Sequence, residues 1–359
     1  MLIIRSSICT LLICLLLLTL PVPAHAEAAT VQAKSAIVLC ADDGSTLFSK
    51  NADSRCLIAS TTKLMTALVC LEHAAFDDSV TAQARHCAVE GSSMYLKAGE
   101  RYTVRELLLG LLLSSGNDAA LALAEHTAGS VPAFVELMNQ KAQALGMRDT
   151  HFDNPHGLDA GTHYSTARDL ARLMCACMEN PAFRSLDSQR TASAAGQTLI
   201  NHNKLLSLCP GCVGGKTGYT KAAGRCLVSC CEREGMRLVC VTLSDPDDWN
   251  DHMRLYDRAY EDYVLHDLNA ELSFDVPVIS GSREIVQAIP APGSKLVLPK
   301  GRDSELTAEL PHFVFAPVSA GDRAGTLLYW KDGTILVRFP LVYAEEATLA
   351  DPCMKYAHT

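Results

Sequence analysis

A serine and a lysine three residues apart, Ser60 and Lys63, are the first pair in the sequence that could do chemistry. On a helix this spacing puts both side chains on one face, one turn apart. A serine hydroxyl is a weak nucleophile until a base takes its proton, and a lysine amine can do so only when uncharged. Burial and a second nearby cation lower the pKa of a lysine, and Lys216 is a candidate for that cation. We interpret Ser60 as a nucleophile and Lys63 as its base.

Two further motifs follow in a fixed order along the chain. Ser115-Gly116-Asn117 is expected between two helices, and Lys216-Thr217-Gly218 is expected just before a strand. Each motif alone is weak, because Ser-x-x-Lys occurs in many helices and Ser-Gly-Asn is an ordinary loop tripeptide. Together, in this order, they form the set found in class A β-lactamases and penicillin-binding proteins.

The Gly-rich segment before Lys216 also has a competing interpretation as a phosphate-binding loop. Such a loop needs a glycine five positions before its last glycine, and that position is Pro210. A phosphate-binding loop also leads into a helix, whereas this segment leads toward a strand beginning at Arg225. We therefore reject nucleotide binding.

The elements that must position these motifs are predicted from periodicity and turn residues. A hairpin is expected over 36–49, with Asp43-Gly44 as its turn. Strands are expected over 225–231 and 236–243, joined by Glu234-Gly235. The expected helices cover 60–73, 103–113, 119–128, 132–145, 165–178 and 248–264. Strands at both ends with helices between them predict an α+β fold.

The two ends of the chain differ in character from this α+β region. Residues 1–26 have a basic start, an apolar run and the cleavage-site pattern Ala24-His25-Ala26, so they are predicted to be a signal peptide. Short alternating strands and turns over 274–346 predict a small all-β domain, and 347–359 is a polar tail. The protein is therefore expected to be secreted across the cytoplasmic membrane, to the cell wall or periplasm.

Composition narrows the possible partners and cofactors. The chain has 359 residues and a formal net charge of -9, which argues against nucleic acid as a partner. Of its 15 cysteines, Cys40, Cys70, Cys226, Cys230 and Cys240 lie in apolar runs and are interpreted as buried side chains. Cys209 and Cys212 have the spacing of a metal or redox motif, but no second pair of ligands follows. We expect no metal and no cofactor, and leave a local disulfide open.

The sequences around the motifs resemble the D-alanyl-D-alanine carboxypeptidases among the low-molecular-mass penicillin-binding proteins, over almost all of the mature chain. This resemblance implies a β-lactamase/transpeptidase-like domain over 27–267, with an antiparallel sheet flanked by helices and a helical subdomain. The similar segments are 58–67, 112–120, 152–159, 165–170, 216–220 with Ala223-Gly224, and the β-rich region from Phe274.

The resemblance also implies a role for each motif residue in an acyl-enzyme mechanism. Ser60 would attack the D-Ala-D-Ala peptide bond, Lys63 would act as base, Ser115 would relay a proton to the leaving amine, and Asn117 would hold Lys63 and the substrate amide. Lys216, Thr217, Gly218 and Tyr219 would bind substrate, with Thr217 on its carboxylate and the Ser60 and Tyr219 N–H groups as oxyanion hole. The implied partners are peptidoglycan pentapeptide stems and inhibitory β-lactam antibiotics.

Alternatives and departures from the family remain. A serine β-lactamase or a D,D-endopeptidase is the alternative enzyme, and a wall-binding module without activity is disfavoured because the motif side chains are intact. Relatives often carry an aspartate where this chain has Val213. Residues 351–359 are not the amphipathic anchor with which the family often ends, so no clear membrane anchor is expected. His156 is interpreted as a loop or surface histidine, and Arg168 and Asp169 as a helix-surface pair.

Overall fold

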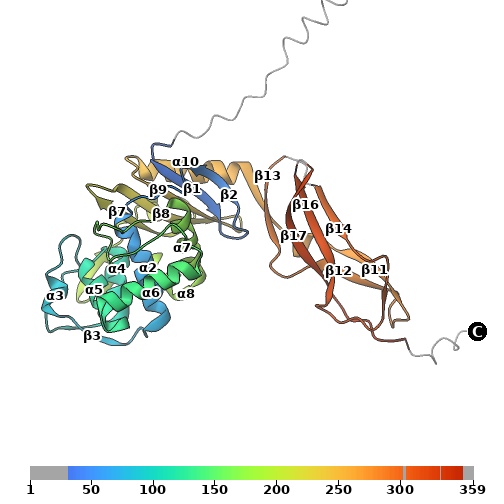
Figure 1. The fold of residues 1–359 in the computed structure, drawn as a ribbon, viewed down its shortest axis with the longest axis horizontal. Helices are drawn as coiled ribbons and strands as arrows, with labels where there is room; N and C mark the ends of the chain where they lie inside the picture. Colours follow the sequence, from blue (N-terminus) through green and yellow to red (C-terminus); the bar gives the residue numbers. More distant parts are fainter. Residues whose placement is uncertain (1–30, 302–304, 332, 351–359) are drawn as a thin grey trace, which may run out of the picture. The chain divides into compact units, whose positions relative to one another are not determined.

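An antiparallel sheet of five strands, in the order β2-β1-β9-β8-β7, lies at the centre of the α+β region (Figure 1). The structure is a computed structural model, and it describes residues 31–301, 305–331 and 333–350. The predicted signal peptide therefore lies outside the described residues. The strands of this sheet are β1 (Ser35–Cys40), β2 (Thr46–Lys50), β7 (Cys212–Thr220), β8 (Gly224–Arg233) and β9 (Met236–Leu243).

Helices cover both faces of this sheet (Figure 1). One face is covered by α10 (Asp248–Asp262), which packs on β8 and β9, and the other by α7 (Ala167–Glu179), which packs on β1 and β9. Strands buried on both faces read as continuous apolar runs. All six residues of β1 and seven of the eight residues of β9 are accordingly buried.

A second group of helices packs beyond α7 and forms the helical part of the domain. The leucines of α4 dominate its core. A capping box starts α4: the Thr103 hydroxyl accepts a hydrogen bond from Glu106 N, and the Glu106 carboxylate accepts one from Thr103 N at 2.9 Å. These helices are α2 (Lys63–His73), α3 (Ala84–Cys87), α4 (Val104–Leu113), α5 (Asn117–Ala128), α6 (Val131–Ala144) and α8 (Pro181–Asp187), and the short α9 (Leu205–Leu208) packs on β7.

Two predictions about the elements that carry the motifs were wrong in detail. The third motif lies inside β7, not before a strand. The pattern did not predict this strand because glycines precede Lys216, and glycine is depleted in strands relative to β-branched residues. Ser60 lies in the 3-10 turn η1 (Ala59–Thr62), and the α-helix begins only at Lys63. The sequence pattern also missed two short hairpins, formed by β3 (Ser79–Thr81) with β4 (Arg101–Thr103) and by β5 (Thr191–Ala194) with β6 (Gln197–Ile200).

The C-terminal part of the chain is a β domain with its own apolar core, as predicted. A six-stranded sheet has the order β14-β16-β17-β12-β11-β15, and β10 pairs with β13. Alternating side chains point into a core that includes Val276, Val286, Leu327 and Leu341. The elements are β10 (Tyr263–Asp267), α11 (Leu268–Glu271), β11 (Phe274–Ile279), β12 (Ile285–Pro290), β13 (Lys295–Pro299), β14 (Glu305–Glu309), β15 (Val314–Phe315), β16 (Arg323–Lys331) and β17 (Thr334–Tyr343).

The described residues were also searched for membrane spans. Across them, none of the helices combines the length and the apolar character needed to cross a bilayer.

Candidate active site

The turn that carries Ser60 is held in an unusual backbone conformation. Ala59, the residue before it, has φ 47, and its carbonyl accepts a hydrogen bond from the Thr62 hydroxyl at 2.9 Å. Gly157 packs directly on this carbonyl: a Cβ added to Gly157 would lie 2.0 Å from Ala59 O, and its φ is 88. The position therefore requires glycine. The close contact fixes the nucleophile turn against the 151–164 loop.

Lys63 is fully buried and lies within hydrogen-bond distance of three oxygens. Its Nζ is 2.7 Å from Ser60 Oγ, 2.7 Å from Asn117 Oδ1 and 2.7 Å from the His156 carbonyl. The last two atoms can only accept hydrogen bonds. A neutral amine has two hydrogens, and these two acceptors use both. Its lone pair then points at the Ser60 hydroxyl, which is the arrangement a base requires.

The surroundings of Lys63 favour that neutral form. Burial holds the pKa of its amine well below the usual range, and the positive charge of Lys216 lowers it further. Burial also lowers the pKa of Lys216, to about 8, although Asp187 acts in the opposite direction. Burial and a neighbouring cation therefore both favour the uncharged amine of Lys63, whereas Lys216, with a pKa of about 8, is still largely cationic near neutral pH.

The second motif lies at the start of α5 and is anchored on both sides. Asn117 Nδ2 donates to the Glu90 carbonyl at 2.7 Å. The Asn117 side-chain atom that faces Lys63 is therefore the oxygen Oδ1. The next residue, Asp118, accepts from the backbone N–H groups of Met94 and Leu96 and from the Ser93 hydroxyl. The segment before α5 is thus bound to the 90–96 loop, with Asn117 pointing at the lysine.

The third motif brings β7 against the nucleophile turn. A Cβ on Gly218 would lie 2.9 Å from Ser60 N, so only glycine lets the two backbones approach this closely. Lys216 is 1% exposed, and its Nζ donates to the Thr217 carbonyl at 3.0 Å. Tyr219, by contrast, is 67% exposed. In β7 the Lys216 amine is therefore buried, whereas the end of the strand at Tyr219 faces solvent.

An aspartate that the sequence did not indicate lies beneath β7. Asp187, the last residue of α8, is fully buried, and its Oδ2 accepts from Gly215 N at 2.6 Å. Its Oδ1 has no hydrogen-bond partner, and burial raises the pKa of its carboxyl to about 7. Asp187 thus brings a carboxyl group from α8 to the strand that carries Val213, the position at which the family resemblance implied an aspartate.

One cleft exposes the predicted reactive groups. Its lining includes residues of all three motifs, together with Arg225, Asp248 and Trp249 beside the end of β7. Arg225 donates to Asp248 at 2.6 Å and its guanidinium lies 5.5 Å from the Trp249 ring centre. The lining residues are Ser60, Ser92, Ser115, His202, Thr217, Gly218, Tyr219, Arg225, Asp248 and Trp249.

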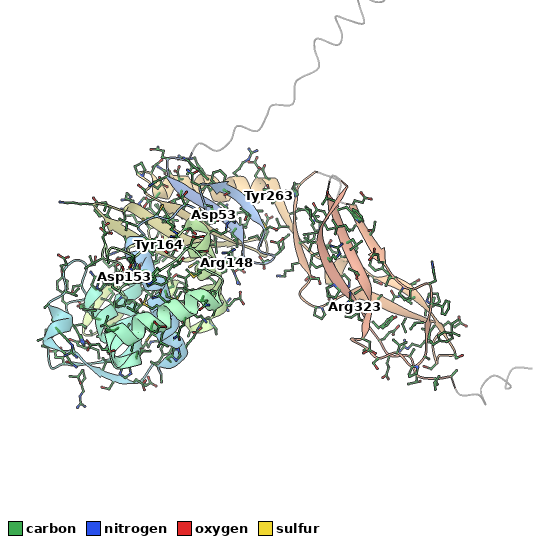
Figure 2. All side chains as sticks on the ribbon, viewed as in Figure 1. Asp53, Arg148, Asp153, Tyr164, Tyr263 and Arg323 are labelled. Atoms are coloured by element: carbon green, nitrogen blue, oxygen red, sulfur yellow. The ribbon has the colours of Figure 1, made fainter. Side chains whose placement is uncertain are left out.

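A loop closed by the pairing of His151 with Tyr164 borders the nucleophile turn; Asp153 and Tyr164 are labelled in Figure 2. Asp153 N donates to His163 Nδ1 at 3.0 Å, so the other ring nitrogen carries the proton and donates to the Thr62 hydroxyl at 2.8 Å. Burial lowers the pKa of His163 to about 4, which keeps the ring neutral. This buried histidine therefore holds the turn around Ser60.

Two interpretations of single residues need correction. His156 lies in a loop, as predicted, but it is not a surface histidine: its carbonyl accepts from Lys63, and burial lowers the pKa of its ring to about 4. Asp169 is 3% exposed and accepts from Asp149 N and the Thr150 hydroxyl, whereas Arg168 pairs with Asp53. The i, i+1 neighbours point in different directions on α7, as helix geometry requires.

The structure brings all eight predicted site residues to one place. Ser60, Ser115, Thr217, Gly218 and Tyr219 line the cleft, while Lys63, Asn117 and Lys216 lie buried beneath them. Sequence reasoning missed Asp187, His163, Arg225 and Asp248, which belong to no motif. Within the described residues, no group of three or more His, Cys, Asp or Glu side chains is arranged to hold a metal ion.

Both the α+β part and the β part of the chain match known protein families. A family profile described as D-alanyl-D-alanine carboxypeptidase matches residues 22–247, and one described as the C-terminal domain of penicillin-binding protein 5 matches residues 260–348. The chain is 32% identical to the D-alanyl-D-alanine carboxypeptidase DacF of Bacillus subtilis, over 95% of this chain and 94% of that protein. It is 31% identical to DacC of Escherichia coli, over 89% of this chain and 85% of that protein.

Solved structures agree with the sequence relatives. Penicillin-binding protein 5 from Haemophilus influenzae superimposes with a TM-score of 0.78 at 28% identity, covering 90% of this chain and 99% of that one. The D-alanyl-D-alanine carboxypeptidase from Mycobacterium tuberculosis gives 0.63 at 36% identity, over 66% of this chain and 94% of that one. With the serine–lysine pair at its centre and a C-terminal β domain like that of penicillin-binding protein 5, the chain thus belongs to the D-alanyl-D-alanine carboxypeptidase family of serine peptidases.

Proposed function

We propose that the protein removes the terminal D-alanine of peptidoglycan stem peptides through an acyl-enzyme on Ser60. Ser60 Oγ attacks the carbonyl carbon of the penultimate D-alanine, and its proton passes to the Lys63 amine. The observation that carries this proposal is the contact between Ser60 Oγ and a buried lysine whose two N–H groups are already used by Asn117 and the His156 carbonyl.

The remaining steps use the second and third motifs. The oxyanion formed during attack is bound by the backbone N–H groups of Ser60 and Tyr219, a role supported by the close approach of Gly218 to Ser60 N. Ser115 relays the proton to the amine of the departing D-alanine. Water then attacks the Ser60 ester, which breaks the acyl–oxygen bond, releases the shortened peptide and returns the proton to the serine.

Recognition of the substrate carboxylate falls to the sheet side of the cleft. Thr217 offers a hydroxyl, and Lys216 offers positive potential beneath it without reaching solvent. Arg225 adds a permanently charged guanidinium to the lining, partly balanced by Asp248. A free carboxylate at the end of the substrate suits this arrangement, and the carboxylate of a β-lactam would occupy the same position.

We further propose that the chain acts outside the cytoplasmic membrane, after removal of residues 1–26. The support is the leader-like sequence of the first 26 residues and membership in a family of peptidoglycan enzymes. Secretion is tested by N-terminal sequencing of protein from expressing cells. A mature chain that begins at Glu27 supports the proposal, and retention of Met1 in the cytoplasmic fraction contradicts it.

The decisive experiment pairs two assays on the same protein. A D-Ala-D-Ala-terminated peptide should release free D-alanine, and penicillin should form a long-lived adduct that maps to Ser60. Rapid penicillin turnover without D-alanine release would favour a β-lactamase, and cleavage of crosslinked dimers with little D-alanine release would favour an endopeptidase. Ser60→Ala is the control that must abolish both signals.

A further inference from the structure

Two buried cysteines lie side by side at the end of the β7–β8 hairpin, outside the active-site cleft. Cys209 precedes β7 in the turn Cys209-Pro210-Gly211, and Cys231 lies near the end of β8, opposite Cys212 in the strand register. Both thiols point at the same acceptor: the Pro210 carbonyl oxygen is 3.8 Å from Cys209 Sγ and 3.3 Å from Cys231 Sγ. Cys209 therefore has Cys231 as its sulfur partner.

A cation completes the cluster. Arg233 Nη2 donates to Cys209 Sγ at 3.4 Å, and its Nε donates to the Pro210 carbonyl at 2.9 Å. The guanidinium is itself fixed by Asp257 and lies 4.9 Å from the Tyr260 ring centre. An arginine held against one sulfur favours the thiolate of that sulfur over its protonated form. Cys209 is thus the nucleophilic member of the pair.

The pKa values of the two thiols are shifted in opposite directions, as a redox-active pair requires. The neighbouring Cys231 thiol lowers the pKa of Cys209, and Arg233 lowers it further. The proximity of Cys209 raises the pKa of Cys231, and burial raises it further. One sulfur is therefore prepared to attack, and the other keeps its proton until a mixed disulfide has formed.

Access to the pair is one-sided. Cys231 is fully buried, whereas Cys209 retains 4% exposure and is flanked by the exposed residues Leu208 and Pro210. A small reagent therefore meets Cys209 first. Several other thiols in the sheet, such as Cys230 and Cys240, are buried with strongly raised pKa values and are poor nucleophiles by comparison.

We propose that Cys209 and Cys231 form a redox-active dithiol that reacts with small organic disulfides. The Cys209 thiolate attacks one sulfur of the disulfide, forms a mixed disulfide and expels one thiolate. Cys231 then loses its proton and attacks Cys209 Sγ, expelling the second thiolate. Two protein thiols are oxidised to one Cys209–Cys231 bond, and the small disulfide is reduced to two thiols. An extracytoplasmic setting, where disulfides persist, supplies such oxidants.

The bond would close a covalent loop around the hairpin that carries Lys216, Thr217 and Gly218. Glu232 N already donates to the Gly211 carbonyl at 2.8 Å, so the turn and the strand are in register before oxidation. The disulfide therefore adds a crosslink to an existing contact and leaves the register of β7 unchanged. Oxidation should raise the midpoint of denaturant unfolding.

The test uses the full-length reduced protein and oxidised glutathione as the probe, followed by alkylation and peptide mapping. Wild type should give a Cys209–Cys231 crosslink. Cys231→Ser should stop at a glutathione adduct on Cys209, and Cys209→Ser should give neither product. The matched control is Cys212→Ser, which should keep the crosslink. A Cys209–Cys212 bond, or folded wild-type protein that forms no crosslink, would overturn the proposal.

A second measurement needs no cysteine variant. The rate of Cys209 alkylation by iodoacetamide, followed against pH in wild type, should reach half its maximum below the ordinary thiol pKa of about 8.5. Arg233→Gln should move that midpoint to higher pH. A wild-type midpoint at or above the ordinary value, or one that Arg233→Gln leaves in place, would contradict the nucleophile assignment.

Discussion

The two walls of the active-site cleft differ in how completely their polar groups are paired. On the helical wall, formed by η1, α2 and the start of α5, Lys63 and Asn117 each have defined partners. On the sheet wall, formed by β7, β8 and the residues bonded to them, buried atoms of Asp187, Arg225 and Asp245 have none. Among the described residues these are the only buried side-chain nitrogen or oxygen atoms without a hydrogen-bond partner.

This difference separates two tasks. Proton transfer needs groups that are fixed before substrate arrives, and the helical wall meets that need with contacts of 2.7 Å around a buried amine. Binding an anion needs positive charge near the cleft, and the sheet wall supplies two cations: Lys216, and Arg225, whose Nε is unpaired although its guanidinium is bonded to Asp248. Substitutions confined to one wall at a time should separate the two tasks.

The largest effect is expected from the base itself. Lys63→Ala should slow acylation of Ser60 by penicillin about 10²–10⁴-fold, because the serine loses the group that takes its proton. Stopped-flow or gel-based labelling with fluorescent penicillin measures the rate, and Ser60→Ala defines the background. A Lys63→Ala protein that is acylated at the wild-type rate would mean that the base is elsewhere.

A smaller effect on the same wall is expected from Asn117. Asn117→Ala removes one of the two acceptors that orient the Lys63 amine, and we expect acylation to slow about tenfold to a hundredfold. The matched control is Asn180→Ala, which loses only a helix cap on Ala182 N and Phe183 N. Equal acylation rates in the two variants would show that orientation of the amine by Asn117 is unimportant.

On the sheet wall, Arg225 should affect binding more than chemistry. Arg225→Gln removes a charge from the cleft, and we expect KM for a D-Ala-D-Ala peptide to rise about threefold to tenfold with little change in kcat. Steady-state release of D-alanine gives both constants. A fall in kcat at constant KM would assign Arg225 to the transition state instead.

Asp187 should change the pH dependence of the reaction. Lys216 is cationic below its pKa of about 8, so acylation should decline as pH rises through that value. The negative charge of Asp187 raises this pKa, and Asp187→Asn should therefore move the decline to lower pH. Asp53→Asn, which alters an exposed pair with Arg168, is the control and should leave the profile unchanged. An unshifted profile in Asp187→Asn would show that Asp187 does not set the pKa of Lys216.

Much of this arrangement followed from the sequence, for identifiable reasons. The motif spacings, the apolar and alternating patterns of β1 and β9 and the turn residues between strands are local, so they predicted the elements and the reactive side chains. Asp187, His163 and Arg225 could not be found in this way, because each has its contact with a residue distant in sequence. Their contacts with Gly215, Thr62 and Asp248 exist only once the sheet and helices have packed.

The placement of β7 shows the limit of local patterns most clearly. Its glycines read as a loop because glycine is unfavourable in strands, yet Gly218 is required there by the approach of Ser60 N. The contact between β7 and the Ser60 turn thus requires glycine at position 218, and a local pattern then assigns the segment to a loop instead of a strand. The same reasoning explains Ser60: the close packing of Gly157 on Ala59 selects a 3-10 turn over the helix that the periodicity predicted.

The protonation state of Lys63 is the quantity on which the mechanism depends, and the pH dependence of penicillin acylation measures it most directly. Because burial and Lys216 hold the pKa of Lys63 well below its usual range, the wild-type rate should level off well below the ordinary lysine pKa and should fall on the acid side of that plateau. A rate that instead climbs about tenfold per pH unit up to the ordinary lysine pKa of about 10.4 would contradict a neutral Lys63 base.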